Sequence, residues 1–332
     1  MKECLSYNDV LLVPQHSDIK SRSEVNLESR LGNKSYTLPI ISSPMDTVTG
    51  TEMALAMEEA GGLGIIHRYC SIPEQIEMIS YEGVRAAAVG ITGDFVDRVA
   101  ALYNAGIRIF CLDVAHGDHL HMQIAIERLK NTYGEEVHVM AGNVATREAY
   151  ERLSKWGADS VRIGIGGGSI CSTRIQTGHG MPTFQSVLDC SQSECDATII
   201  ADGGITTAGD IVKALAAGAD FVILGSLLAG TNETPGEVFK SKKGKEYKVY
   251  RGMASKEAQK DWRGSFSSNE GVSTTVDTKG PVKSILDDLA NGIRSGLSYS
   301  GSRTIFGLQA KAEFIRQTVS GQVESSTHIL RQ

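Results

Sequence analysis

Short apolar runs alternate with segments of helical composition along most of the chain. We predict strands at 40–42, 62–67, 86–91, 107–114, 137–141, 160–163, 198–201 and 221–224. The segments between them predict helices at 51–60, 76–81, 95–104, 121–131, 147–156 and 208–217. Such units, roughly 20–35 residues apart, are typical of an α/β fold of the (β/α)8 TIM-barrel class. A doubly wound sheet is the alternative, but the regular units show no break in composition, which favours a closed barrel.

The segments outside the barrel predict an N-terminal extension and C-terminal loop and hairpin elaborations. We expect a single catalytic domain over residues 1–332, with the barrel core at about 39–230 and a short strand at 11–13 before it. The lysine-rich segment 240–248 indicates a solvated hairpin. Residues 254–280 are polar and lack periodicity, which predicts an active-site loop at about 250–280. A helix is predicted at 285–297, and Gly-Ala-Asp at 157–159 and 218–220 predicts two similar turns leading into strands.

Composition excludes several classes of partner. The 332 residues carry a net charge of −6, so we expect neither nucleic acid nor a membrane as a partner. No apolar run approaches the roughly 18 residues that would span a bilayer. The six cysteines show no zinc-site spacing and no secretory signal precedes them, so we expect reduced thiols in a cytoplasmic protein.

Polar residues follow most of the predicted strands, at the end where barrel enzymes collect their reactive groups. The residues at these positions are Ser43 and Met45, Asp113, Asn143, the glycine loop at 164–168, Asp202 to Gly204, and Gly225 with Ser226. The loops after the last two strands are where barrels commonly bind phosphate. A carboxylate there, Asp202, suits a ribose diol because it accepts from two hydroxyls. The collection indicates a nucleotide.

The glycine loop carries a candidate nucleophile. Four of the five residues from Gly164 to Gly168 are glycine, which lets the backbone approach a ligand closely. Carbonyls of such a loop can converge on a cation, and its N–H groups can bind phosphate. Cys171 and Thr173 follow, so a thiol stands beside a hydroxyl, as nucleophilic catalysis requires.

Taken together, eight segments resemble the IMP dehydrogenase/GMP reductase family, in the order in which that family carries them. They are residues 7–12 (YNDVLL), 43–48 (SPMDTV), 113–117 (DVAHG), 141–146 (AGNVAT), the Cys171 loop, 201–204 (ADGG), 250–253 (YRGM) and 270–271 (EG). The resemblance covers nearly the whole chain. It implies a barrel, a purine nucleoside 5′-monophosphate as substrate, a nicotinamide cofactor, a monovalent cation such as K⁺ near the cysteine loop, and a homotetramer.

The resemblance is closest in architecture to GMP reductase. Dehydrogenases of the family usually insert a pair of regulatory CBS domains after the second barrel strand, although some lack them, and here residues 72–81 run straight on to the third strand. Dehydrogenases also carry a long flap with an Arg-Tyr pair that activates water. The segment between Met253 and Glu270 is shorter and has Trp262-Arg263-Gly264 instead. Against this, the sequence resembles dehydrogenases more than the familiar reductases at three places. These are Ser43-Pro44, His116 and Arg251.

The resemblance implies roles for individual residues. The catalytic residues are Cys171, which attacks C2 of the purine, and Thr173 with Glu270, which relay protons. Residues implied in substrate binding are Ser43, Met45, Asn143, Ser169, Asp202, Gly203, Gly204, Gly225, Ser226, Tyr250, Gly252 and Met253. Asp113, Ala115 and Gly164 would face the cofactor, and the carbonyls of Gly166, Gly168 and Cys171 the cation. His67, His116 and His179 are expected to be structural.

Three functions therefore remain open. The first is an NADPH-dependent GMP reductase that converts GMP to IMP and ammonia. The second is an IMP dehydrogenase without CBS domains, which would use NAD and release XMP. The third is a barrel that binds purine nucleotide without turnover, against which the presence of Cys171, Thr173 and Glu270 argues.

Overall fold

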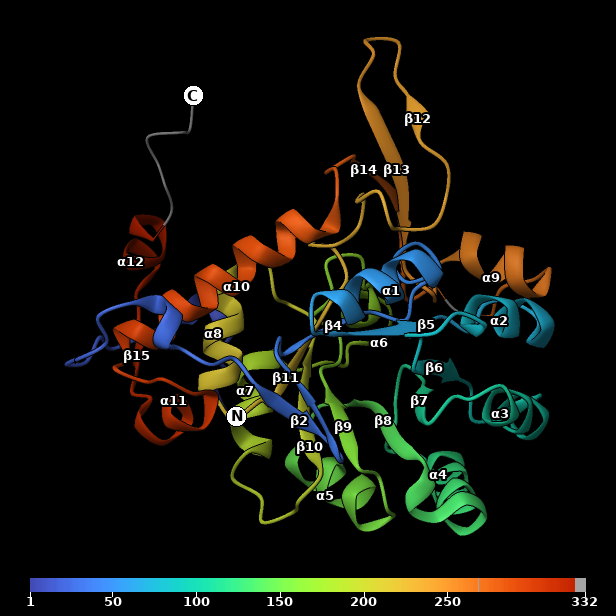
Figure 1. The fold of residues 1–332 in the computed structure, drawn as a ribbon, viewed down its shortest axis with the longest axis horizontal. Coiled ribbons are helices and arrows are strands. Elements are labelled where there is room, and N and C mark those ends of the chain that lie inside the picture. Colours follow the sequence, from blue (N-terminus) through green and yellow to red (C-terminus); the bar gives the residue numbers. More distant parts are fainter. Residues whose placement is uncertain (268, 326–332) are drawn as a thin grey trace.

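Parallel strands close into a barrel at the centre of the molecule (Figure 1). The structure is a computed structural model and describes residues 1–267 and 269–325. The barrel strands are β4 (Ile40–Ser42), β5 (Leu63–Ile66), β6 (Ala86–Val89), β7 (Ile109–Asp113), β8 (His138–Val144), β9 (Ser160–Ile163), β10 (Thr198–Asp202) and β11 (Phe221–Leu224). They follow in chain order around the barrel, and β11 pairs with β4 to close it. All eight predicted strands and the TIM-barrel class are confirmed.

Helices surround the barrel and cover its outer face. They are α1 (Thr51–Glu59), α2 (Ile72–Ile79), α3 (Phe95–Asn104), α4 (Leu120–Tyr133), α5 (Arg147–Lys155), α7 (Thr183–Cys190) and α8 (Ala208–Ala216). The helix predicted at 76–81 begins earlier, because Ser71 and Glu74 form a capping box that fixes its start. The prediction also missed α7, which follows the glycine loop. Short helix α6 (Thr173–Thr177) lies between that loop and α7.

Two layers of apolar side chains hold this arrangement together. Residues pointing into the barrel form the inner layer, including Ile41, Ile65, Cys111, Met140 and Ile223. Alternate residues of the same strands point outward and pack against the helices in one large cluster. Strands buried on both faces explain the short, continuous apolar runs of the sequence. The core therefore lies within and around the barrel wall and leaves the strand ends free for function.

The repeated Gly-Ala-Asp motif makes the same connection twice. Gly157 and Gly218 adopt positive φ values of 106° and 109° after α5 and α8, as helix-ending glycines do. The carboxylate of Asp159 then accepts the Val139 N–H at 2.6 Å. The carboxylate of Asp220 accepts the Ile199 N–H at 2.9 Å in the equivalent place. Each aspartate thus fastens the start of its strand to the neighbouring strand, as two similar turns predicted.

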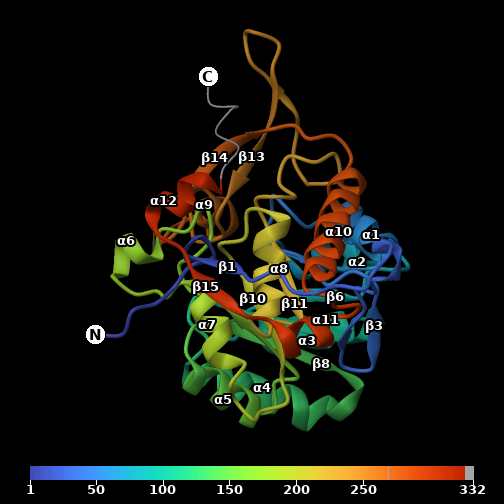
Figure 2. The ribbon, with the colours of Figure 1, turned by 90° about the vertical axis from the view of Figure 1, so that its left-hand side faces the viewer.

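Segments near the two ends of the chain pair with each other. Strand β1 (Val10–Leu12) pairs antiparallel with β15 (Phe314–Arg316), so the N-terminal extension and the C-terminal segment form one small sheet (Figure 2). A hairpin of β2 (Ser29–Leu31) and β3 (Lys34–Tyr36) follows in the extension. Near the other end lie α10 (Val282–Tyr299), α11 (Ile305–Lys311) and α12 (Val319–Glu324). The helix predicted at 285–297 is confirmed and extends further in both directions.

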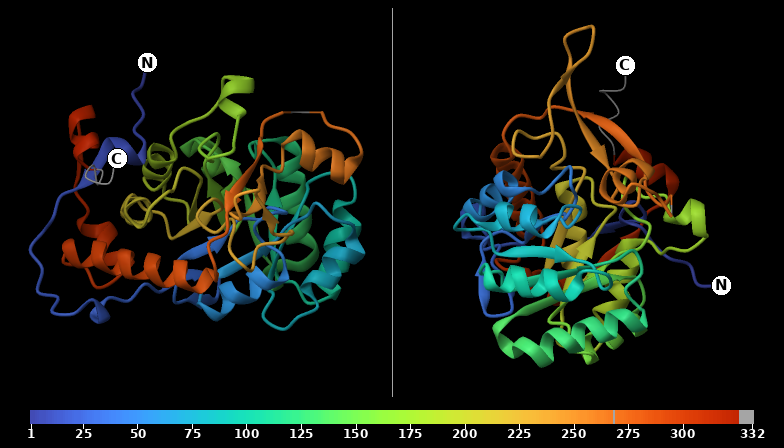
Figure 3. Two further views of the ribbon diagram at one scale, coloured as in Figure 1. Left: turned by 90° about the horizontal axis from the view of Figure 1, so that it is seen from above. Right: turned by 90° about the vertical axis from the view of Figure 1, so that its right-hand side faces the viewer.

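The elaboration between the barrel and α10 is a sheet rather than a hairpin alone. Strands β12 (Phe239–Lys240) and β13 (Glu246–Arg251) form the predicted hairpin, which projects from the barrel in Figure 1. The segment 254–280, predicted as an irregular loop, contains helix α9 (Lys256–Arg263) and strand β14 (Ser273–Asp277). Strand β14 pairs with β13 along its whole length. In the left panel of Figure 3, the orange helix α9 stands to one side of these strands.

Candidate active site

A single cavity of about 570 Å³ collects every residue that the sequence predicts for the site. It is lined by the C-terminal ends of the barrel strands, by the glycine loop and by the segment around α9. All three groups of predicted residues, catalytic, substrate-binding and cofactor-binding, face this space. His67, His116 and His179 are absent from its lining. The roles of the individual lining residues remain predictions.

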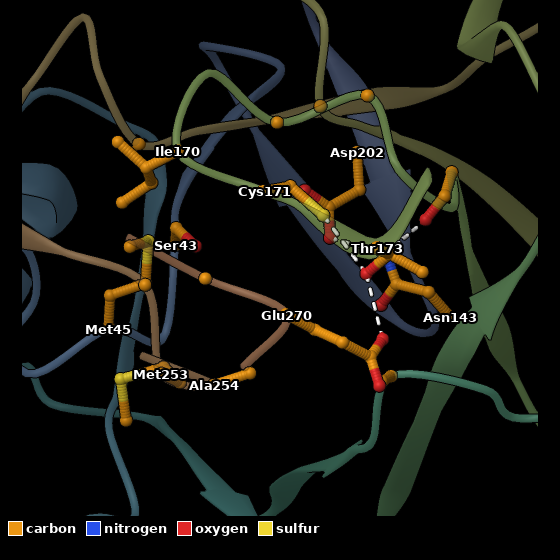
Figure 4. A pocket seen from close by; sticks show the side chains of 18 of the residues that line it. Ser43, Met45, Asn143, Ile170, Cys171, Thr173, Asp202, Met253, Ala254 and Glu270 are labelled. Atoms are coloured by element: carbon orange, nitrogen blue, oxygen red, sulfur yellow. Dashed lines mark hydrogen bonds between the residues drawn. The ribbon is translucent and has the colours of Figure 1, made fainter. Parts of the chain in front are cut away.

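A hydrogen-bonded chain of three side chains lies at the centre of the cavity (Figure 4). The Cys171 thiol donates to Thr173 Oγ1 at 3.2 Å, and the Thr173 hydroxyl donates to Glu270 Oε2 at 2.9 Å. Glu270 is distant in sequence, yet the threonine hydroxyl connects it to the sulfur. A hydroxyl between a thiol and a carboxylate can pass a proton in either direction by rotating. The arrangement therefore fits a nucleophile served by a proton relay.

Backbone pairing brings the two parts of this relay together. Cys171 and Gly271 form an antiparallel bridge, and the Ser172 N–H donates to the Glu270 carbonyl at 2.9 Å. The Val272 N–H donates to the Ile170 carbonyl at 3.0 Å, which continues the pairing into β14. The cysteine loop is thus an extra edge on the sheet that carries Glu270. No periodicity in the sequence indicates this pairing, because it involves only a few residues of irregular segments.

Two carboxylates and a buried arginine line the floor of the cavity. Arg162 donates from Nη1 to Asp113 Oδ1 at 2.8 Å and from Nη2 to Asp202 Oδ2 at 2.9 Å. Asn143 Nδ2 donates to the same Asp202 oxygen at 2.9 Å, and Arg68 Nε lies 3.3 Å from Asp113 Oδ2. Burial alone would raise the pKa of Asp113, but the guanidinium groups of Arg162 and Arg68 outweigh it and lower that pKa. Both carboxylates are therefore oriented to accept from a ligand.

Close packing of the backbone shapes the predicted phosphate end. Gly164 has φ +149°, and a Cβ there would lie 1.9 Å from the Asp202 carbonyl oxygen, so only glycine fits. At Gly225 a Cβ would approach the Tyr250 hydroxyl to 3.0 Å. Burial raises the pKa of Tyr250, and the neighbouring Ser169 side chain partly offsets this rise. Gly225 and Ser169, which belong to two of the loops predicted to hold phosphate, thus both lie near Tyr250.

The segment around α9 is anchored to the barrel. Arg251 Nη2 lies 2.6 Å from Asp46 Oδ2, in the loop after β4, and its Nη1 lies 2.5 Å from Asp261 on α9. The Trp262 ring stacks on Tyr69 with centroids 6.1 Å apart and planes at 19°. Tyr69 follows β5, so a barrel loop meets the segment between Met253 and Glu270, which we call the flap, at this contact. These contacts fix α9 at the rim, where Gln259 and Arg263 line the cavity.

Sequence reasoning missed four lining residues with charged or aromatic side chains. They are Arg68, Tyr69, Arg162 and Arg263. Arg162 lies in the middle of an apolar strand and is buried, and a buried arginine requires partners, but the sequence does not show which residues these are. Arg68 directly follows a strand, so its place at the functional end could have been inferred. Arg263 was noted only as part of a flap that lacks Arg-Tyr.

Comparison with known proteins identifies the family. The model of the IMP dehydrogenase/GMP reductase domain matches residues 4–328. The chain belongs to the IMP dehydrogenase/GMP reductase family. It is thus an oxidoreductase of this family, whose members use a nicotinamide cofactor.

Relatives with both names are similarly distant from this member of the family. An inosine-5′-monophosphate dehydrogenase of Nitrosopumilus maritimus is 33% identical, with 98% of each chain covered. A GMP reductase of Leishmania major is 31% identical, with 99% of this chain and 97% of the relative covered. The dehydrogenase of Cryptosporidium parvum is 36% identical, with 98% and 94% covered. Identity therefore separates the family from others but does not separate the two activities within it.

The missing insertion does not separate the two activities either. The alignment with the Leishmania reductase spans 482 positions and that with the Nitrosopumilus dehydrogenase 470, both far more than the 332 residues of this chain. Relatives of both names thus contain a large block of residues without a counterpart here. The direct run from 72 to 81 into the third strand, which seemed to favour a reductase, carries no weight in that choice.

A solved structure of the family has nearly the same fold. It is a cysteine-to-alanine variant of GMP reductase from Trypanosoma brucei in complex with guanosine 5′-monophosphate. The TM-score is 0.92 at 30% identity, with 99% of this chain and 98% of that chain covered. Among the described residues, no helix is both long and apolar enough to cross a membrane.

The cavity suits a dinucleotide cofactor beside a nucleotide. Asp113 and Asp202 belong to neighbouring parts of the floor, and Arg162 lies between them. Asp113 could accept from one ribose and Asp202 from the other, because ionised carboxylates are acceptors only. The indole of Trp262 and the ring of Tyr69 provide a flat apolar surface at the rim. The residues present therefore fit a nicotinamide cofactor on the Asp113 side.

Proposed function

We propose that this member of the family is a GMP reductase, which converts GMP to IMP and ammonia with NADPH, and that the chain acts as one catalytic domain. The observation that carries the proposal is the flap. Its described part holds α9, without an Arg-Tyr pair, between Met253 and Glu270. A dehydrogenase needs a base to activate water against its covalent intermediate, whereas a reductase needs none. The relay of Thr173 and Glu270, in contrast, suits the departure of ammonia.

Binding of the substrate uses the cavity floor and its glycine loops. Asp202 receives the ribose hydroxyls, while Tyr250 and Ser169 stand where the phosphate binds, with N–H groups of Gly203, Gly204, Gly225 and Ser226 nearby. Ser43, Asn143 and Gly252 complete the nucleotide site. Met45 and Met253 border the purine; the Met253 sulfur accepts from the Asp46 N–H at 3.3 Å, which fixes that side chain. These contacts place C2 of the purine beside Cys171.

The chemistry then runs through the sulfur. Cys171, as thiolate, adds to C2 of GMP, and the amino group leaves as ammonia after Glu270 supplies a proton through Thr173. A nicotinamide cofactor held on the Asp113 side would supply the hydride that replaces the sulfur on C2, and would itself be oxidised. Cleavage of the bond between C2 and the sulfur returns Cys171 to the thiolate and yields IMP. Asp113, Ala115 and Gly164 hold the cofactor side of the cavity during this step.

We place a monovalent cation such as K⁺ at the carbonyls of Gly166, Gly168 and Cys171. The Gly168 carbonyl already accepts the Cys171 N–H at 3.1 Å, so the turn that carries these oxygens is tight. Its remaining lone pair and the other carbonyls are of the hard oxygen type that such cations prefer. The cation would order the loop that presents the sulfur. A homotetramer in the cytoplasm is the accompanying expectation from the family.

One assay tests the proposal against its alternatives. Incubation with GMP and NADPH should lower the absorbance of reduced nicotinamide and yield IMP. IMP dehydrogenase is the second candidate, supported by identities of 33% and 36% to relatives of that name. It would instead raise this absorbance with IMP and NAD and yield XMP. Binding of GMP without turnover in either mixture would indicate the noncatalytic barrel.

A further inference from the structure

The buried arginine on the cavity floor contacts both predicted ribose-binding carboxylates. Arg162 is 5% exposed and lies on β9, between β8 and β10 in the barrel wall. Its Nη1 donates to Asp113 on β7, and its Nε and Nη2 both donate to Asp202 on β10, at 3.1 and 2.9 Å. One planar guanidinium thus spans two strands that are not neighbours. Arginine can do this because its donors point in fixed, divergent directions.

The hydrogen bonds leave ligand-facing acceptor sites on the two carboxylates. All three bonds that Asp202 accepts, two from Arg162 and one from Asn143, end on Oδ2. Asp113 receives Arg162 on Oδ1 and Arg68 on Oδ2 at 3.3 Å, a longer contact. Each carboxylate oxygen has more than one lone pair, so both groups can accept further hydroxyls. Arg162 therefore sets the direction in which each carboxylate faces the cavity.

We propose that Arg162 is a positioning residue that orients Asp113 and Asp202 together, so that nucleotide and cofactor binding depend on the same buried guanidinium. The inference rests on the proposed roles of these carboxylates toward the two riboses. It assigns Arg162 no contact with reacting atoms. It also explains why an arginine occupies an otherwise apolar strand, since the strand must neutralise charge at two ligand sites at once.

The electrostatics of the floor support this role. Arg162 and Arg68 are the cations that contact the two carboxylates. The other titratable groups that face them among the described residues are Cys111, Tyr7, Tyr69 and Tyr250. Burial raises the pKa of Cys111 to about 11 and also raises the pKa of the three tyrosines, so all four groups stay neutral near pH 7. Loss of the Arg162 charge would remove one of the two guanidinium groups that lower the pKa of Asp113 against the effect of burial, so that pKa would rise.

Binding measurements on the full-length protein test the proposal. In Arg162→Gln, the dissociation constants for GMP and for NADPH, each measured alone by calorimetry, should both rise roughly 10–100-fold, the usual range for losing charge-assisted hydrogen bonds. NADPH binding, which uses Asp113, should also weaken more steeply than in the wild type as pH falls from about 8 to 6. Arg162→Lys should restore the wild-type pH profile but not the affinities, because an ammonium keeps the charge and loses the fork.

Two further variants separate the outcomes. Lys248→Gln removes another buried cation, which donates to Thr231 and Thr234 carbonyls outside the cavity, and should leave both affinities and the pH profile unchanged. If Arg162→Gln does not fold, equal loss for both ligands in Arg162→Lys supports the proposal. An effect on one ligand alone, in either Arg162 variant, would overturn it. Unchanged GMP affinity in Asp202→Asn would instead refute the ribose assignment, and the proposal with it.

Discussion

Replacement of Glu270 by glutamine gives the sharpest test of the proton relay. The amide has the same shape as the carboxylate, and its oxygen can still accept from the Thr173 hydroxyl, now 2.9 Å from Glu270 Oε2. Geometry at Cys171 should therefore persist, while the side chain can no longer supply or take a proton. General acid–base catalysis is worth about 10²–10⁴-fold. We expect kcat with GMP and NADPH to fall by that factor, about 3–5 kcal/mol in the activation barrier.

The two halves of the reaction distinguish a relay from a general defect. Release of ammonia needs a proton, whereas hydride transfer between IMP and NADP⁺ does not. A rapid-mixing experiment with IMP and NADP⁺ should show a smaller loss in Glu270→Gln, and the dissociation constant for GMP should change little. Glu257→Gln, at an exposed carboxylate on α9, is the matched control and should behave as wild type. Equal losses in both halves, or none in either, would refute the relay and weaken the assignment as a reductase.

Three other changes address the nucleophile, the nucleotide site and the fold. Cys171→Ala should abolish turnover yet leave GMP binding measurable by calorimetry; a residual rate above about a hundredth of wild type would exclude the sulfur as nucleophile. Asp202→Asn should raise KM for GMP, each charge-assisted bond being worth about 1.5–3 kcal/mol, and an unchanged KM would make Asp202 structural. Burial raises the pKa of Asp220 from 3.8 to about 6, so its protonated form stabilises the fold at low pH and that contribution is lost as pH rises through 6. Asp220→Asn should therefore stabilise the protein at pH 8 by up to about 3 kcal/mol and have less effect at pH 4; equal melting temperatures at pH 8 would contradict this.

The barrel could be predicted because each of its strands is recognised from a few consecutive residues. Each strand is a short apolar run buried on both faces, as at 86–89 and 221–224, and each needs only a few residues to be recognised. The Gly-Ala-Asp turns were equally predictable. The glycine of each motif adopts the positive φ, and the aspartate of the same motif accepts a backbone N–H from the neighbouring strand. The collection of polar residues at strand ends followed from the barrel itself.

The missed features depend on contacts between distant segments. Helix α9 buries little, and its sequence has no apolar stripe that distinguishes it from a loop; Trp262 packs instead on Tyr69 from the barrel. The pairing of Cys171 with Gly271 joins two irregular stretches whose composition does not suggest strands. Arg162 was overlooked because a single charge in an apolar run acquires meaning only when its partners on other strands are known. The resemblance to the family supplied Glu270, which local pattern could not.

The backbone pairing at the base of the flap makes the position of Glu270 independent of the length and sequence of the flap. Gly252 donates to the Val272 carbonyl at 3.0 Å and Cys171 pairs with Gly271, so the segment that leaves at Met253 and returns at Glu270 has a closed base. Whatever lies between these points, the Glu270 carboxylate re-enters at the same place relative to the Cys171 sulfur. The length and sequence of this segment can therefore change without moving Glu270 relative to Cys171. A family with one nucleophile could thus acquire different second half-reactions by loop replacement alone.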